Sequence, residues 1–278
     1  MLKRLSTKWL ATIGIVGLAG VGATVGLVNS VGATPGTSSS VSREAASPVT
    51  TASFKFSASV SGLTPSALTA TGTGQADFQN HAVSLSINAP AIAHGLIASG
   101  PDSPGVINAT LSGGTAYLQI PSLASKMGTP WISVALPSEA TSAVPGIFTK
   151  VASALGNVNA IVEFAKAHHA TVTSLGSAIV DSVQATGNKI VTTRSHSGKS
   201  HTFTMSVWAD SSDRLVQATV TSSGATKKGP LDFTATVDFT SYGLPATITV
   251  PAPSQVKAIP FSTVKMFLGM AHHRVPGV

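Results

Sequence analysis

The chain has 278 residues, a formal net charge of +7 and no cysteine. The missing cysteines exclude a disulfide framework and a thiolate metal site. Lys3, Arg4 and Lys8 place part of the positive charge at the extreme N-terminus, and Lys227-Lys228 is the only later cluster. Nucleic-acid binding needs a basic stripe with interleaved aromatic residues, so we expect no nucleic-acid partner.

Residues 1–33 have the parts of an export signal, with a basic start and an apolar run from Trp9 to Val28. Val31-Gly32-Ala33 places small residues where signal peptidase cleaves, after Ala33. The apolar run is also long enough to span a bilayer. The segment is therefore either a cleaved signal peptide or an anchor that holds residues 9–28 in the cytoplasmic membrane. Both alternatives predict an extracytoplasmic protein, secreted or anchored to the outer face of that membrane.

Residues 34–51 are rich in Ser, Thr and Pro and predict a flexible linker before a β-rich domain over residues 52–256. Apolar and polar residues alternate along several segments of that domain, as expected for strands with one covered face. Asn80 and Ser112-Gly113-Gly114 mark tight turns. The strands predicted in this half are Ser53–Gly62, 69–79, His81–Ala89, 105–111, 114–120 and the strand of Trp131.

The period then changes to that of helices. Phe148, Val151 and Leu155 recur at intervals of three and four residues. Pro145 suits the first turn of this helix and Gly156 its end. A second helix is predicted to follow a cap at Asn157 or Asn159, to end at His168-His169 and to have one apolar side. That side comprises Val158, Ile161, Val162 and either Phe164 or Ala165.

Strands are predicted to resume near Thr171, with a hairpin turn at Gly187-Asn188 and another at Asp210–Asp213. Apolar residues alternate with polar ones from Phe203 to Val207 and from Leu231 to Phe239, which predicts two strands with one apolar face each. Residues 257–278 are predicted to form a C-terminal tail with a short apolar stretch. This tail is either disordered or loosely docked on the domain, or it lies on a membrane. The pattern predicts an α+β fold: a curled antiparallel β-sheet of about 10–11 strands with two helices covering its concave face.

Several of these segments resemble a known family. One strand ends in Val207-Trp208-x-Asp210, and the next begins with Arg214-Leu215. This arrangement is similar to the actinobacterial LppX/LprAFG lipid-carrier lipoproteins, which share the half-barrel of the LolA and LolB carriers. Further similar segments are Gly114–Ile120, Pro130–Val134, Ser241–Pro245 and Thr247–Pro251, so the resemblance covers roughly residues 50–256. The chain departs from the family in lacking the lipobox cysteine.

Motifs for catalysis are missing from the sequence. No Gly-x-Ser-x-Gly elbow is present, and no histidine spacing matches a metal site. His168 and His169 are adjacent, so they point in different directions on a helix, and His196 and His201 flank a predicted hairpin tip. We therefore expect neither an enzyme nor a metal or cofactor site.

The remaining candidate site is the space between sheet and helices, because ligand sites are concave and mostly apolar. One predicted wall is the helical face and the other is formed by strand residues; together they comprise Phe148, Val151, Leu155, Ile161 and Phe164, opposite Leu118, Ile120 and Trp131. The alternative is that these side chains fill a dry core. The resemblance implies that acyl chains of a lipid or glycolipid enter this space without covalent chemistry.

Three functions follow as hypotheses. The first is an exported, non-enzymatic carrier or sensor of an amphiphilic lipid. The second is a cell-envelope interaction module with a filled core, which binds protein or wall polymer through its Thr-rich face. The third is an envelope-stress sensor of the LolA-like kind. The sequence leaves the oligomeric state open.

Overall fold

The structure is a computed structural model and describes residues 49–62, 66–90, 105–121, 124, 127–196, 199–226 and 229–263. The predicted signal or anchor, the linker up to residue 48 and the end of the tail lie outside these residues. Among the helices of the described ranges, none is long and apolar enough to cross a membrane.

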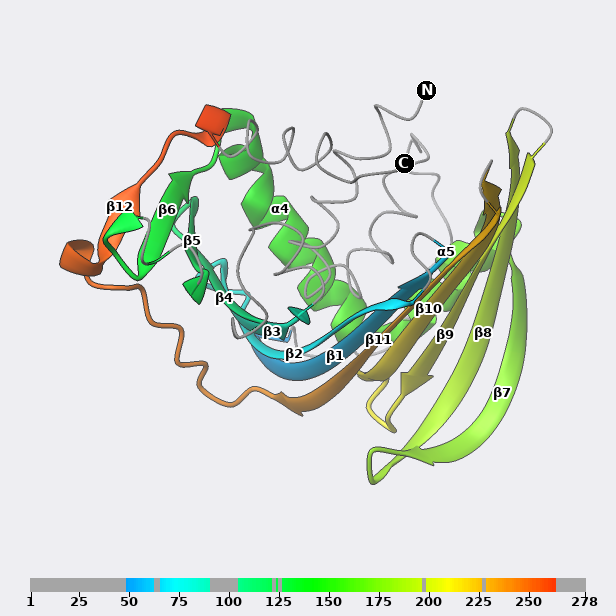
Figure 1. Cartoon of the computed structure of the whole chain (residues 1–278). Coiled ribbons are helices and arrows are strands. Elements are labelled where there is room, and N and C mark those ends of the chain that lie inside the picture. Colours follow the sequence, from blue (N-terminus) through cyan, green and yellow to red (C-terminus); the bar gives the residue numbers. More distant parts are fainter. Residues whose placement is uncertain are drawn as a thin grey trace.

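Twelve strands form one sheet in the order β12-β6-β5-β4-β3-β2-β1-β11-β10-β9-β8-β7 (Figure 1). Every neighbouring pair is antiparallel except β12 and β6, which are parallel. The bounds are β1 Thr51–Ser61, β2 Leu68–Asp77, β3 Ala82–Asn88, β4 Val106–Ser112, β5 Thr115–Gln119, β6 Trp131–Ala135, β7 Thr171–Val180, β8 Val183–His196, β9 Lys199–Ala209, β10 Leu215–Thr226, β11 Gly229–Tyr242 and β12 Val256–Ala258.

The sheet has more strands than the expected number of about 10–11. Strand β12 was not predicted from the sequence. It has three residues and lies at the start of the predicted tail. A strand this short is too brief for alternation to reveal. Along the chain, the sheet therefore begins at Thr51 and ends at Ala258. Val49, just before the first strand, is already buried in the core.

Alternation gives the sheet two chemically different faces. On β1, Phe54 and Phe56 are buried whereas Lys55 and Ser57 are exposed. The register places Phe54 opposite Phe239 of β11, so the apolar side chains of neighbouring strands share one face. We call this the inner face, because α4 and α5 pack against its side chains in one core cluster.

The opposite, outer face is built largely from Ser and Thr side chains. Thr219 and Thr236 are cross-strand neighbours whose hydroxyl oxygens lie 3.1 Å apart. Gln217 donates a hydrogen bond of 2.7 Å to Asp238 on the next strand. Short polar side chains and cross-strand pairs of this kind suit a sheet face that contacts water.

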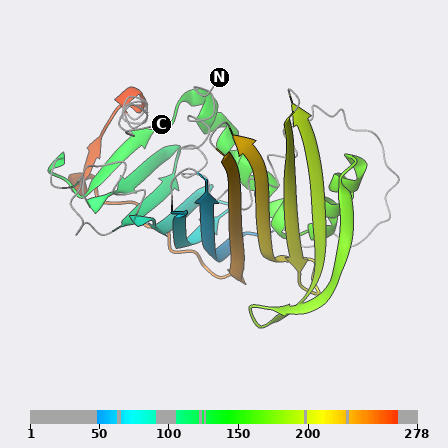
Figure 2. The same cartoon turned by 45° about the vertical axis from the view of Figure 1, so that its right-hand side comes forward.

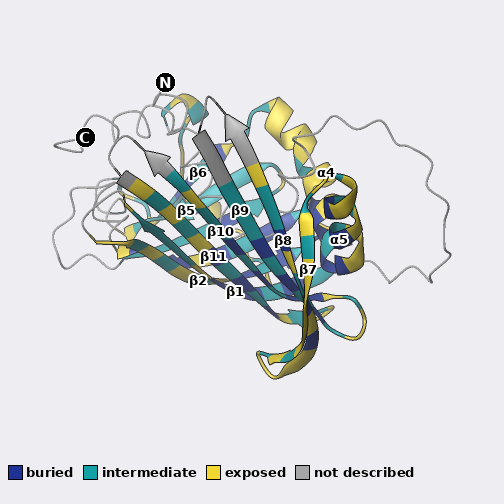
Figure 3. Ribbon diagram, turned by 90° about the vertical axis from the view of Figure 1, so that its right-hand side faces the viewer, coloured by how far each residue is buried: buried dark blue, intermediate teal, exposed yellow. Residues whose placement is uncertain are grey.

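Helix α4 (Ser138–Leu155) lies inside the curve of the sheet, and α5 (Val158–Ala167) lies beside β7 (Figures 1 and 3). The sequence predicted Pro145 in the first turn, but α4 begins earlier, at Ser138, and contains Pro145 in its interior. The apolar spacing that identified the helix starts only near Pro145, because the first six residues of α4, Ser138–Ala143, are exposed and show no apolar side.

The cap of the second helix follows the prediction. Asn157 accepts a hydrogen bond of 2.9 Å from the backbone of Ala160, so it is the N-cap. Gly156 ends α4, and His168 ends α5. The hairpin turn predicted at Gly187-Asn188 was wrong.

Gly187 and Asn188 lie inside β8, and the turn between β7 and β8 is formed by Asp181 and Ser182. Gly187 is needed for close packing, since a Cβ there would lie 2.6 Å from the Trp208 ring. A glycine in a strand therefore marked a close approach rather than a turn. Figure 2 shows the β7–β8 hairpin extending beyond its neighbours.

Candidate functional site

The two ends of the inner face differ. We call the end where β1 starts and β11 ends the closed end, because the junction between α4 and α5 lies there against the β9–β10 turn. We call the other end, where β1 ends and β11 begins, the open end. The closed end is described first, since it fixes the position of the helices.

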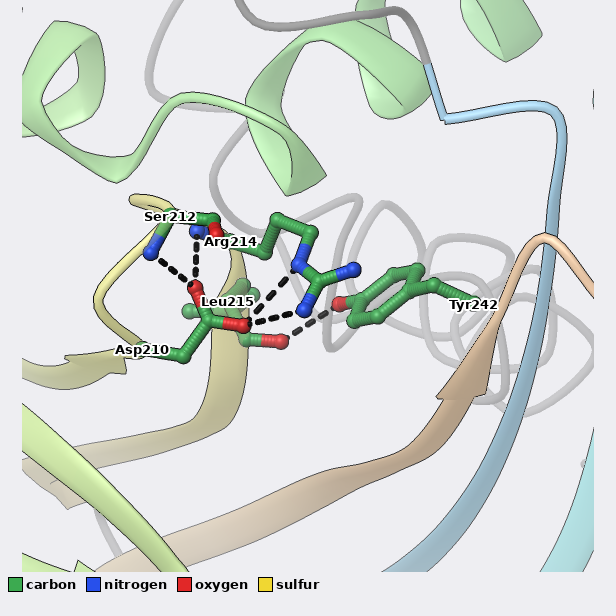
Figure 4. A network of polar contacts seen from close by, with 5 residues as sticks. All are labelled: Asp210, Ser212, Arg214, Leu215 and Tyr242. Carbon is green, nitrogen blue, oxygen red and sulfur yellow. Dashed lines mark hydrogen bonds and ion pairs between the residues drawn. The ribbon is translucent and has the colours of Figure 1, made fainter.

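A polar network stabilises the closed end (Figure 4). Asp210 accepts hydrogen bonds from the backbone N–H groups of Ser212, at 2.8 Å, and Arg214, at 3.0 Å. The guanidinium of Arg214 also forms an ion pair of 2.8 Å with the same carboxylate. These contacts close the turn between β9 and β10, as the short polar residues of the sequence predicted.

Tyr242, the last residue of β11, connects this turn to the sheet. Its hydroxyl donates a hydrogen bond to the backbone carbonyl of Leu215, and the Arg214 guanidinium lies 5.6 Å from the centre of its ring. Burial raises the pKa of the Tyr242 hydroxyl far above its usual range, and the nearby Asp210 carboxylate raises it further. The hydroxyl therefore remains a donor, which indicates a structural role.

The same turn holds the start of α5. The backbone N–H of Val158 donates to the Asp213 carbonyl at 3.1 Å, and that of Asn159 lies 3.2 Å from the Asp213 carboxylate. A carboxylate at a helix N-terminus satisfies otherwise unpaired N–H groups and complements the helix dipole. The helices are thereby fixed to the closed end of the sheet.

Three of the predicted site residues fill the core instead of lining an accessible surface. Phe148 and Val151 are 1% exposed and Leu155 is 0% exposed. The Phe148 ring makes edge contacts with Phe78 at 6.0 Å and with His81 at 5.8 Å. At these three positions the side chains are packed inside the core cluster.

The predicted residues of α5 lie at the border of the core. Ile161 is half-buried and packs against the core cluster. Phe164 is half-buried as well, and its ring stacks on His168 with centroids 3.9 Å apart. The buried side of α5 is formed by Val158, Val162 and Ala165. The sequence left open whether Phe164 or Ala165 belongs to this side, and Ala165 is the buried one.

The predicted strand wall is divided between the two faces. Leu118 pairs with Ile132, so both side chains lie on the inner face. Trp131 precedes Ile132 and therefore lies on the outer face, which corrects the prediction that it lines the same wall as Leu118. Ile120 follows the end of β5 and is half-buried. Strand register decided this placement, and the register cannot be inferred from the sequence alone.

The open end carries apolar residues that the prediction missed. A row of four apolar side chains and one serine crosses the inner face of five adjacent strands, β2, β1, β11, β10 and β9. All five members are half-buried: Leu68, Val60, Phe233, Ser222 and Phe203. We call them the open-end row. Alternation in the sequence placed Phe203 and Phe233 on an apolar face, but only the register brings them into one row.

The next row towards the closed end has small side chains. Ala70, Ala58 and Ala235 are direct neighbours across β2, β1 and β11. Ala58 and Ala70 are half-buried. The large side chains of the open-end row therefore border a strip of methyl groups. Such a surface offers dispersion contacts to an apolar chain along its length and few hydrogen-bonding groups.

Among the described residues, no group of three or more His, Cys, Asp and Glu side chains is placed to hold a metal ion. Asp77, the last residue of β2, lies at the closed end opposite Thr51 and accepts hydrogen bonds from Asn80 and from the backbone of Gln79. Burial alone would raise its pKa, but these hydrogen bonds and the nearby His81 together outweigh burial and lower the pKa of Asp77.

No protein-family model matches the chain, and no curated protein sequence does so either. The structure is similar to that of the Mycobacterium tuberculosis lipoprotein LppX, with 12% identity, coverage of 72% of this chain and 90% of that chain, and a TM-score of 0.39. It is also similar to a LolA superfamily protein from Nitrosomonas europaea, with 10% identity, coverage of 74% and 93%, and a TM-score of 0.29. Both are the kinds of protein that the sequence resembles, and at these values neither likeness determines what the chain binds.

Proposed function

We propose that the protein is an exported, non-enzymatic carrier or sensor of an amphiphilic lipid, whose acyl chain lies between the inner face of the sheet and the helices. The observation that carries the proposal is the open-end row of half-buried apolar side chains beside the alanine strip. Leu118, on the inner face of β5, and Ile161, which packs against the core cluster from α5, are further half-buried apolar side chains. Burying one methylene group contributes about 0.8 kcal/mol, so one long acyl chain gives ample affinity.

A second candidate is an envelope interaction module without a small-molecule ligand. The complete burial of Phe148, Val151 and Leu155 favours it, because the core next to α4 is filled by the protein itself. The two candidates make opposite claims about the open end. An acyl chain covers this surface in the carrier, whereas in the interaction module the surface takes up no lipid.

Binding of a fluorescent fatty-acyl probe distinguishes them. Phe233→Asp places a charge in the open-end row, and we expect the dissociation constant for the probe to rise at least about tenfold. Thr234→Asp is the matched control, since Thr234 is the next residue of β11 and lies on the outer face, where it is exposed. This variant should bind as the wild type does, with circular dichroism reporting the fold of both.

Native mass spectrometry of the protein purified from its own host identifies the lipid class. A co-purifying lipid that is missing from Phe233→Asp and retained in Thr234→Asp supports the carrier. A wild-type protein that neither contains lipid nor takes up the probe contradicts the carrier and favours the interaction module.

A further inference from the structure

The two edges of the sheet differ in how they are protected against pairing with another strand. Unpaired N–H and C=O groups on an edge strand are a template for a further strand, and proteins block them with short strands, charges, prolines or bulges. At one edge, β12 has three residues, one of which is Lys257, and Pro260 follows closely. At the other edge, β7 has ten residues with no charge and no proline.

The first part of β7 is covered by α5, whereas its second part extends beyond the neighbouring strands (Figure 3). A bulge separates the two parts at Leu175, where the register with β8 shifts. The hairpin carries exposed apolar side chains: Leu175 is 40% exposed, Ile179 75% and Val183 38%. A protruding edge with large exposed aliphatic residues is typical of a surface that pairs with another chain.

The hairpin geometry shows which backbone groups face outward. Asp181 and Ser182 both have positive φ, 46° and 70°, which is the pattern of a two-residue type I′ turn. Val180 and Val183 flank the turn and so exchange hydrogen bonds with each other. Hydrogen bonding alternates along an antiparallel pair, so the N–H and C=O groups of Ile179 and Ser177 point to the free edge.

We propose that the free part of β7, Gly176–Val180, pairs antiparallel with the same segment of a second copy of the chain. Ser177 of one copy then exchanges both hydrogen bonds with Ile179 of the other, and Ala178 faces its own counterpart on the two-fold axis. In such a pair a charged residue on the edge would lie close to the same residue of the second copy and repel it. An edge strand without charges therefore suits self-pairing.

A second copy fits this edge better than a membrane surface. The hairpin from Thr171 to Gly187 has no Lys or Arg, and Asp181 at its tip would face anionic headgroups. The protected β12 edge also prevents β7 from adding to it head to tail, so pairing closes as a dimer and does not propagate into a filament. The ladder is short, and we therefore expect a weak dimer that depends on protein concentration.

Disulfide cross-linking tests the register directly, since the natural chain has no cysteine. Residues in a non-hydrogen-bonded antiparallel pair have Cα atoms about 4.5 Å apart, which is within reach of a disulfide. Full-length Ala178→Cys should therefore form a cross-linked dimer under mild oxidation. Ser57→Cys, on the exposed outer side of the central strand β1, is the matched control and should remain monomeric. No dimer from Ala178→Cys, or equal dimer from both variants, overturns the proposal.

Sedimentation velocity of the full-length chain gives a second test. Ile179→Lys should abolish the dimer by placing two like charges across the pair, whereas Leu244→Lys makes the same change at another exposed aliphatic residue, 63% exposed, and should leave it intact. A wild-type protein that stays monomeric at high micromolar concentration contradicts the proposal. Loss of vesicle binding by Ile179→Lys, with a monomeric wild type, would instead assign the hairpin to a lipid surface and would also overturn it.

Discussion

The two ends of the inner face use similar residues for different purposes. At the closed end, aliphatic and aromatic side chains are buried completely, and the network of Asp210, Arg214 and Tyr242 fixes the turn below them. At the open end, side chains of the same kinds stay half-buried on the same strands. The surroundings of an apolar strand residue, and not its type, therefore decide whether it belongs to the core or to the candidate binding surface. Changes at the closed end should therefore affect stability, and changes at the open end should affect binding.

The largest effect is expected from Leu155→Ala. Leu155 is 0% exposed, so its truncation leaves a cavity and should lower the free energy of unfolding by about 2–5 kcal/mol. Val60→Ala removes aliphatic volume from the open-end row and should lower it by less than about 1 kcal/mol, because part of that side chain already contacts solvent. Urea unfolding measures both. Equal losses would remove the distinction between the two ends.

Tyr242→Phe tests the polar network. The variant keeps the ring and removes only the hydroxyl, which leaves the Leu215 carbonyl without its donor. We expect a loss of about 1–3 kcal/mol in the free energy of unfolding, with binding of the acyl probe unchanged at temperatures where the protein is folded. Weaker probe binding at unchanged stability would instead make Tyr242 a residue of the site.

A smaller effect is expected from Asp213→Asn. Asparagine tolerates the positive φ of 61° at this position but lacks the charge that faces the start of α5. The loss should be about 0.5–1 kcal/mol, and it should shrink at high salt. Asp232→Asn, on the exposed face of β11, is the control and should leave thermal unfolding unchanged.

The smallest effect concerns pH. The folded pKa of Asp77 is lowered from its usual value of 3.8, so its carboxylate stabilises the fold above that value. The contribution disappears as pH falls through the lowered folded pKa. Because the group is largely exposed, we expect Asp77→Asn to cost less than about 0.5 kcal/mol at neutral pH. The difference from wild type should vanish in strongly acidic buffer, and a difference that persists there would point to lost packing instead.

Local patterns in the sequence determined the strands, most of the turns and the two helices. Alternation at Phe203–Val207 and Leu231–Phe239, the cap at Asn157 and the turn at Asp210–Asp213 all have local physical causes, and the structure contains each of them. Where the local signal was weak or ambiguous, the prediction erred. The exposed first turns of α4 have no apolar side, and Gly187 served packing against Trp208 rather than a turn.

Only the tertiary structure decided which apolar residues are core and which are half-exposed. Phe148 and Phe233 look alike in the sequence, since each belongs to an apolar face of a regular element. Burial depends on contacts between residues far apart in the chain, and those contacts follow from the register of β1 with β11 and from the place where α4 and α5 are anchored. A shift of one residue would turn every side chain of a strand to the other face. The sequence by itself therefore determined the elements and their amphipathic faces, and the register and helix placement decided the candidate site.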